Sequence, residues 1–436
     1  MISDRFPDPE RYAWFREHSQ AIIKQCRREV QSVPDWQNNP LAVYVPGGDG
    51  KYPSFWVRDA VMICRSGLIP LAEMMAMCRL ILVMQNQAET RFLANGLRIT
   101  PWAIADHINL PGLGLAESQP PGAVFFPGTY LSGENQGNGY FGLRPADDNI
   151  YEVIMLVRLI VDALPRDAGH RFLMEELHGI GILERLDRGW QAMPVDMTAG
   201  LPLNAENDWS ASSFHDALRP LGLVALTSVL RARATRDLAR LYDCMGDRKR
   251  AAEFEAVAKQ LGKTIVDTFQ RDDGWLMMAS KVNRQADLWS TSMAVFEGIL
   301  PAQAEEAACR ALLREVVSGG VIDPDSGYLR HTPTCEDIEP GRRIYEHETE
   351  PTDCRTYQYG GYWPQCTGFV CYALNKIDPH AARCLAEIFI DHTRDHVDEG
   401  CPVEWLHPVD GIPLNGRLYG PSAALPLCAF TQMMSH

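Results

Sequence analysis

Apolar residues recur along most of this chain at the three- and four-residue spacing of amphipathic helices. The pattern is clearest at 149–164. Pro70 divides one long apolar stretch, and Gly246 with Asp247 marks a turn between two long helices. The periodicity predicts helices at 9–31, 57–86, 149–164, 212–246, 249–270, 288–297, 302–318, 365–376, 379–397 and 421–434.

Long segments rich in Gly, Pro, Asn and aromatic residues separate these helices. Long ordered loops are usually functional, and a few short strands are expected in them, for example at 272–280. About six helix pairs without a clean sequence repeat predict an all-α fold, an (α/α)6 toroid whose loops meet at one end. An open α-solenoid is the alternative. No shift in composition marks a boundary, so one domain over 1–436 is expected.

The charge balance excludes some partners. Lys and Arg total 41 and Asp and Glu total 56, a formal net charge of −15 without any basic tract. Nucleic-acid and membrane binding are therefore disfavoured. The twelve cysteines show neither a CxxC pair nor metal-ligand spacing, and no signal peptide or membrane span is visible. The sequence predicts a cytoplasmic protein without a metal or organic cofactor, and leaves its oligomeric state open.

Residues 401–411 place a carboxylate among apolar and aromatic neighbours. A loop glutamate is usually a solvated charge, but Glu404 lies between Pro402 and Pro408, so we expect it to be rigid and partly buried. Trp405 follows directly. Aromatic faces stack on sugar rings, and a carboxylate beside them can activate water at a sugar carbon. Glu404 is therefore a candidate for catalysis or ligand contact.

Asp208 precedes Trp209 and a serine-rich stretch that leads into the predicted helix 212–246. An aspartate at such a place commonly caps the helix, but Ser210 can provide the cap instead. We interpret Asp208 as free to enter a cleft. There Trp209 would desolvate it and favour its protonated form, as a general acid requires.

Trp56, Arg58 and Asp59 open the stretch 57–86. One interpretation is structural, with Arg58 paired to Asp59 and Trp56 in the core. The other is that Arg58 keeps Asp59 ionised so that Asp59 accepts hydrogen bonds from sugar hydroxyls. Whether Asp59 rather than Asp208 is the general acid stays open.

Residues 357–364 combine two glycines with aromatic side chains. Glycine lets the backbone approach a ligand, Gln358 offers a donor and an acceptor, and Tyr359 and Trp363 offer aromatic surfaces. A tight turn with core aromatics is the alternative. Asp287, directly before a predicted helix, is interpreted as its cap.

Together these motifs resemble the six-hairpin, (α/α)6-barrel glycosidases, which include glucoamylases, trehalases and processing α-glucosidases. Residues 56–60 are similar to their Trp-x-Arg-Asp segment, and 357–364 to their Gln-x-Gly-x-Trp-Pro loop. Residues 207–210 resemble the segment that carries the general acid. Residues 403–411 and 419–424 resemble the C-terminal segment that carries the base.

The resemblance implies an inverting, exo-acting glycoside hydrolase that needs no cofactor and acts on a small α-glucoside or related disaccharide. Asp208 would protonate the leaving oxygen and Glu404 would activate water, with the two carboxyl groups about 6.5–9.5 Å apart. The substrate-binding residues would be Trp56, Arg58, Asp59, Trp209, Gln358, Tyr359, Trp363, Trp405 and Tyr419.

Three other functions remain open. A glycoside phosphorylase would need an anion pocket near the base, and a sugar epimerase would need a pair of cleft histidines. The third is a sugar-binding protein without catalysis.

Overall fold

The computed structural model describes residues 8–30, 41–52, 54–86, 89–92, 98–110, 124–125, 144–210, 215, 218–336 and 357–435. Side chains are described in these ranges except at 91–92, 124–125 and 359. The helices are α1 (Pro9–Cys26), α2 (Val57–Cys64), α3 (Leu71–Val83), α4 (Asn149–Ala163), α5 (Arg166–Met174), α6 (Ile182–Ala192), α7 (Ala225–Cys244), α8 (Arg248–Phe269), α9 (Leu288–Phe296), α10 (Ala302–Ser318), α11 (Thr367–Asn375), α12 (Pro379–Asp395) and α13 (Gly420–Met434).

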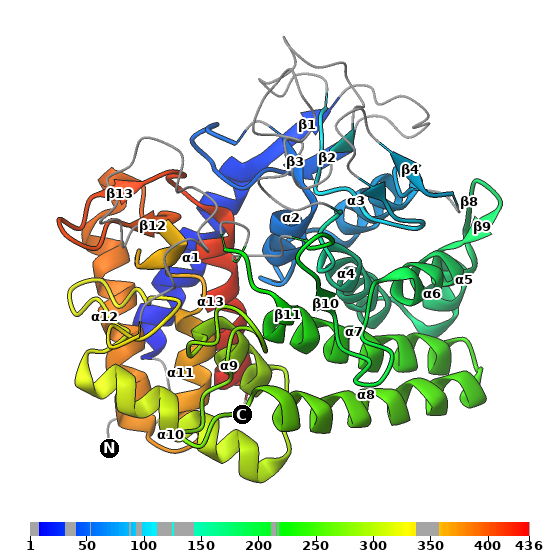
Figure 1. The fold of residues 1–436 in the computed structure, drawn as a ribbon. Helices are drawn as coiled ribbons and strands as arrows, with labels where there is room; N and C mark the ends of the chain where they lie inside the picture. The colour runs from blue at the N-terminus through cyan, green and yellow to red at the C-terminus, as the bar shows by residue number, and fades with distance from the viewer. Residues whose placement is uncertain are drawn as a thin grey trace.

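Six of these helices form a closed inner ring (Figure 1). Around the ring, α2 packs on α4, α4 on α7, α7 on α9, α9 on α11, α11 on α13, and α13 back on α2. Their buried faces join one hydrophobic core that runs from Phe15 to Met433. The predicted (α/α)6 toroid is therefore confirmed, and the open solenoid is not what forms.

The remaining helices form an outer layer. α3, α5 and α6 pack on α4, α8 packs on α7, α10 on α9 and α11, and α12 on α11. α1 completes this layer because it packs on both α12 and α13, which joins the two ends of the chain. Its Arg11 guanidinium donates to both carboxylate oxygens of Asp391, with Nε–Oδ1 3.0 Å and Nη2–Oδ2 2.9 Å.

The lengths of the connections show at which end of the ring the long loops lie. The inner helices from α2 to α11 are each joined to the following outer helix by a short link; the one at Met245–Asp247 contains the predicted Gly246 turn. The connections back to the next inner helix are long. The chain returns through the outer layer between successive inner helices, with α5 and α6 together making the return from α4 to α7, so the inner helices run parallel and begin at the end where the long connections lie.

Short strands occur mostly in those long connections. β1 (Arg27–Val30) pairs with β2 (Leu41–Tyr44), and β6 (His107–Ile108) lies between β3 (Phe55–Trp56) and β7 (Val124–Phe125). Two-stranded pairs are formed by β4 (Arg91–Phe92) with β5 (Arg98–Ile99), β8 (Glu176–Leu177) with β9 (Ile180–Gly181), β10 (Leu203–Asn204) with β11 (Gly222–Leu223), and β12 (Trp405–Leu406) with β13 (Pro413–Leu414). The strand expected at 272–280 forms only isolated bridges.

Two helix boundaries differ clearly from the prediction, and two helices were not predicted. The helix expected at 212–246 begins at Ala225, because Pro220 cannot continue a helix and Gly222 adopts a positive φ of 91° in β11. The first helix ends at Cys26, because the residues after it pair as β1. Helices α5 and α6 were not predicted. The single-domain expectation stays a prediction.

Close packing of α11 on α13 depends on Gly368. A Cβ atom there would lie 2.6 Å from Pro426 Cα and 2.9 Å from Ala429 Cβ. Neither contact can be relieved by a side-chain rotation, so the two helices would have to separate.

We therefore expect Gly368→Ala to lower the free energy of unfolding by about 1–3 kcal/mol despite the better helix propensity of alanine. Gly181→Ala is the control, because the nearest atom to its added Cβ is 3.7 Å away. Urea unfolding measures both. A Gly368→Ala protein as stable as Gly181→Ala would contradict the close packing.

Candidate active site

The long connections bring candidate side chains to the starts of the inner helices. Arg58 and Asp59 lie in the first turn of α2, Tyr419 directly precedes α13, and Asp287 caps α9 by accepting from Ser290 N. The cap role predicted for Asp287 is confirmed. Residues far apart in sequence therefore share one end of the ring.

Glu404 is buried, as expected, with 3% of its surface exposed. Its Oε2 accepts a hydrogen bond from the Tyr52 hydroxyl and one from Gly416 N, 3.0 Å away. Its own backbone is fixed by Gly416 and by the Gln365 side chain, which donates to the Glu404 carbonyl at 3.0 Å. The carboxylate is thus held in one orientation before any ligand arrives.

Asp59 bonds a second tyrosine, Tyr419, which lies beside Tyr52. Its Oδ1 accepts from the Tyr419 hydroxyl at 2.7 Å, and the Tyr419 ring lies 5.9 Å from the Tyr52 ring. Burial raises the pKa of Asp59 above its ordinary value, although Arg58 and Tyr419 oppose the shift. Burial, followed by the charges of Asp59 and Glu404, also raises the pKa of Tyr419. Two tyrosines therefore connect the two carboxyl groups.

Arg58 does not pair with Asp59, and this corrects one prediction. Its Nη1 donates to Asp106 Oδ1 at 3.0 Å, while Asp106 Oδ2 bonds His107 Nδ1 at 2.9 Å. Burial acts to raise the pKa of Asp106, but Arg58 and His107 outweigh it and the pKa is lowered. His107 stacks on Trp56 with ring centroids 4.8 Å apart. The ionised partner of Arg58 is therefore Asp106, and the raised pKa of Asp59 opposes the expectation that Arg58 keeps it ionised.

Asp208 lies in a different setting from the one expected. It forms an isolated bridge with Ala205 instead of preceding a helix, and 40% of its side chain is exposed, so Trp209 does not desolvate it. Arg98 Nη2 donates to Asp208 Oδ1 at 3.0 Å and to Oδ2 at 2.9 Å. Arg144 donates to the Asp208 carbonyl and lies 3.7 Å from Oδ2.

A chain of hydrogen bonds links Asp208 to the Asp59 region. Arg144 also donates to Asp147 Oδ2 at 2.8 Å, just before α4. Asn149, at the start of α4, donates to the carbonyl of Ala105 at 3.2 Å, and Ala105 directly precedes the Asp106 that binds Arg58. Asp208, Asp59 and Glu404 therefore belong to the same end of the ring.

Solved structures share this architecture. A crystal structure of GH63 mannosylglycerate hydrolase from Thermus thermophilus, in complex with Tris and D-glycerate, matches with a TM-score of 0.52 and 15% identity, over 95% of this chain and 99% of that chain. An uncharacterised conserved protein from the same organism matches with a TM-score of 0.52 and 13% identity, over 95% and 99%. No protein-family model and no curated protein matches the sequence.

The fold is that of the six-hairpin barrels. Identities of 13–15% establish the fold alone, and the expected resemblance is confirmed at that level. What each side chain does in this six-hairpin barrel has to come from its own contacts.

The remaining predicted aromatics are buried against protein. Trp363 and Trp405 stack on each other with ring centroids 6.2 Å apart, and Arg219 lies 5.4 Å from the centre of the Trp209 ring. Gln358 is buried in the turn 357–359, and the side chain of Tyr359 lies outside the described residues. Stacking of these rings on a sugar stays a prediction.

The sequence reasoning missed three residues that shape the site. Tyr52, Arg98 and Arg144 hold the predicted carboxylates. Tyr52 lies in a Gly/Pro-rich loop, and its partner Glu404 is 352 positions away, so no local signal marks it. Asp106 and His107 are recognisable in the sequence as a loop element that could line the cleft or cap a helix, and in the structure Asp106 holds Arg58.

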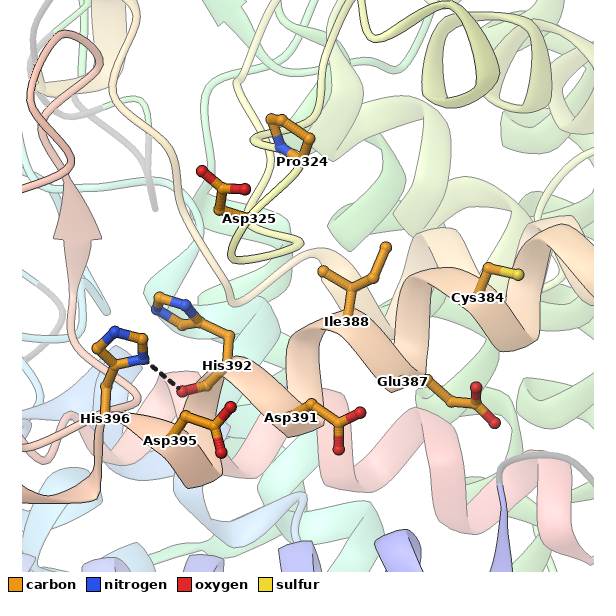
Figure 2. A pocket seen from close by; sticks show the side chains of 9 residues that line it. All are labelled: Pro324, Asp325, Cys384, Glu387, Ile388, Asp391, His392, Asp395 and His396. Atoms are coloured by element: carbon orange, nitrogen blue, oxygen red, sulfur yellow. Dashed lines mark hydrogen bonds between the residues drawn. The ribbon is translucent and has the colours of Figure 1, made fainter.

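A separate hollow of about 500 Å³ lies on the outer helix α12, where it is lined by acidic side chains and by His392 and His396 (Figure 2). The two imidazole rings stack 4.2 Å apart, and burial followed by the neighbouring His396 lowers the pKa of His392 to about 4. The hollow lies on the outer layer, and none of Asp59, Asp208 and Glu404 lines it. Within the described ranges, no group of three or more His, Cys, Asp or Glu residues could hold a metal, and no helix is long and apolar enough to cross a membrane.

Glu152 is a buried carboxyl group that the sequence did not single out. It lies in the first turn of α4, is 0% exposed, and neither side-chain oxygen has a hydrogen-bond partner. Burial raises its pKa from 4.5 to about 7, with Arg65 opposing and Asp148 reinforcing the shift. The folded chain therefore binds this proton more tightly than the unfolded chain does.

This difference predicts a pH-dependent stability. The contribution of Glu152 is fully present below pH 4.5 and is lost as the pH rises through about 7, so ionised Glu152 costs about 3 kcal/mol at pH 8. Relative to wild type, Glu152→Gln should gain about that much stability between pH 5 and pH 8 in urea unfolding. Glu253→Gln, on the exposed face of α8, is the control. Parallel pH curves for wild type and Glu152→Gln would contradict the prediction.

Proposed function

We propose that this protein is a glycoside hydrolase that acts with inversion on a small glycoside, such as an α-glucoside or a related disaccharide. The observation that carries the proposal is the orientation of Glu404. Glu404 is a buried carboxylate that Tyr52 and Gly416 hold, and Asp59 and aromatic side chains lie near it. A carboxylate held in this way can remove a proton from water at a sugar carbon. The solved GH63 mannosylglycerate hydrolase of the same fold supports the reaction class.

The proposed step is a single displacement. Glu404 takes a proton from water as the water oxygen bonds to the anomeric carbon. The bond from that carbon to the leaving oxygen breaks, and Asp208 gives its proton to that oxygen. The products are a sugar of inverted configuration and the free aglycone, and solvent then restores both carboxyl groups to their starting states.

The neighbouring residues would position the sugar. In this proposal Asp59 and Arg58 contact its hydroxyls, and Trp56 provides an aromatic surface for the sugar ring. The whole chain would act as one catalytic domain. A cytoplasmic location is supported by the cysteines of the described residues, which are all free.

The activity test is proton NMR of the purified protein with α- and β-linked disaccharides and glycosyl-glycerates, with and without phosphate. The proposal expects a new anomeric signal of inverted configuration. Glu404→Gln should lower kcat by about 10²–10⁴ because it removes the base. Turnover that requires phosphate would favour a phosphorylase, and sugar binding without any turnover would favour a binding protein.

A second comparison identifies the general acid. Asp208→Asn and Asp59→Asn are each assayed with a substrate that has an alcohol leaving group and with the matching 2,4-dinitrophenyl glycoside, whose leaving group needs no proton. The acid variant should lose about 10²–10⁴ in kcat on the first substrate and much less on the second. If Asp59→Asn shows this pattern and Asp208→Asn does not, the raised pKa of Asp59 marks the acid and the assignment of Asp208 fails.

Tyr52→Phe tests how the base is held. The variant loses a hydrogen bond to ionised Glu404, so the acidic limb of the kcat/KM profile should move to higher pH while the basic limb stays. Tyr44→Phe, which removes a similar bond to Glu73 in the first turn of α3, is the control. Unchanged pH profiles in both variants would show that Tyr52 does not tune the base.

A sugar epimerase is the second candidate, because the described residues include a pair of neighbouring buried histidines near this end. The rings of His215 and His331 lie 5.8 Å apart, and His215 Nε2 bonds the helix-capping Asp287 at 3.0 Å. Epimerisation would appear in the same NMR experiment as conversion of a reducing sugar without release of an aglycone. His331→Gln would abolish it, whereas Glu404→Gln would abolish hydrolysis.

A further inference from the structure

Two arginines hold Asp208 in different ways. Arg98 Nη2 bridges both carboxylate oxygens, at 3.0 and 2.9 Å, and 42% of the Arg98 side chain is exposed. Arg144 is 1% exposed and holds the Asp208 backbone together with Asp147 and the carbonyl of Leu203. Arg144 therefore builds the loop, whereas the contact of Arg98 with Asp208 is within reach of solvent and can be exchanged.

The charge balance changes when Asp208 becomes an acid. Among the described residues, the guanidinium groups of Arg98 and Arg144 face the carboxylates of Asp208 and Asp147, so the charges of these four side chains balance. A proton on Asp208 removes one negative charge, and Arg98 then loses the carboxylate partner that the described residues give it. A general acid must nevertheless carry that proton when the substrate binds.

We propose that Arg98 is a specificity-determining residue that selects glycosides whose leaving group carries a carboxylate, which replaces Asp208 on Arg98. The native occupant of the guanidinium is itself a carboxylate, so the replacement keeps the same bonding geometry. A neutral leaving group would leave Arg98 unpaired each time Asp208 is protonated. This inference rests on the proposed hydrolase function and names its substrate class.

The exchange adds no step to the chemistry. The leaving-group carboxylate bonds Arg98, Asp208 takes a proton from solvent, and that proton passes to the leaving oxygen as the glycosidic bond breaks. The released hydroxy acid carries its carboxylate away, and ionised Asp208 returns to Arg98. Arg98 therefore couples the charge of the leaving group to the state of the acid.

The test compares two glycosides of the hydrolysed sugar that differ only in the leaving group, glycolate or ethylene glycol. Wild type should prefer the glycolate glycoside by about 10² or more in kcat/KM, which is a typical effect of one close charge pair on binding. Arg98→Gln should reduce this ratio to within about threefold, and Arg98→Lys should restore part of it. Equal ratios in wild type and Arg98→Gln would overturn the inference while leaving hydrolysis intact.

Arg79→Gln is the matched control. It removes an arginine that binds both oxygens of Glu175, with Nε–Oε1 2.6 Å and Nη2–Oε2 2.8 Å, between outer helices. The preference for the glycolate glycoside should match wild type in this variant. A ratio that falls in Arg79→Gln as far as in Arg98→Gln would show that general loss of an ion pair, and not anion selection, explains the effect.

A calorimetric titration with free glycolate tests the exchange without turnover. Asp208→Asn removes the competing carboxylate, so it should bind glycolate at least tenfold tighter than wild type, and the double variant with Arg98→Gln should lose that gain. If no glycoside is hydrolysed but this pattern holds, the hydrolase proposal fails and the anion site stands. If glycolate affinity is the same in all three proteins, the anion site fails.

Discussion

The parallel direction of the inner helices is the constraint on which this structure depends. Between successive inner helices the chain returns through the outer layer, so every inner helix begins at the same end. Helix starts carry a partial positive charge, and they favour carboxylates. Asp59 and Asp287 both occupy such starts, as does Asp148 before α4. The topology therefore gathers carboxyl groups at one end of the barrel.

Arginine and tyrosine side chains bind the carboxyl groups at this end, whose pKa values are shifted in different directions. Arg58 lowers the pKa of Asp106, whereas Asp59, one residue from Arg58, keeps a raised pKa because burial dominates. Adjacent residues on a helix point about 100° apart, so Arg58 can serve a neighbouring strand while Asp59 faces Tyr419. The first turn of α2 thus supplies both an arginine, Arg58, that binds an ionised aspartate and a carboxyl group, Asp59, that retains its proton more readily.

The sequence predicted the elements whose signals are local. The Gly246 turn, the cap at Asp287 and the start of α2 after Trp56 follow from residue types and spacing, and the six-pair pattern led to the toroid. The sequence did not predict the features that depend on partners far away along the chain. The end of α1 is set by pairing with β2, and the hold on Glu404 comes from a tyrosine in a loop without periodicity.

The site is a junction between the two ends of the chain. Tyr52 and Glu404 are 352 positions apart, and Asp59 and Tyr419 are 360 apart. Glu404 and Tyr52 can meet only when the last inner helix docks beside the first. A ligand bound across these residues would fasten the first hairpin to the last, so the seam of the barrel would become harder to open as the site fills.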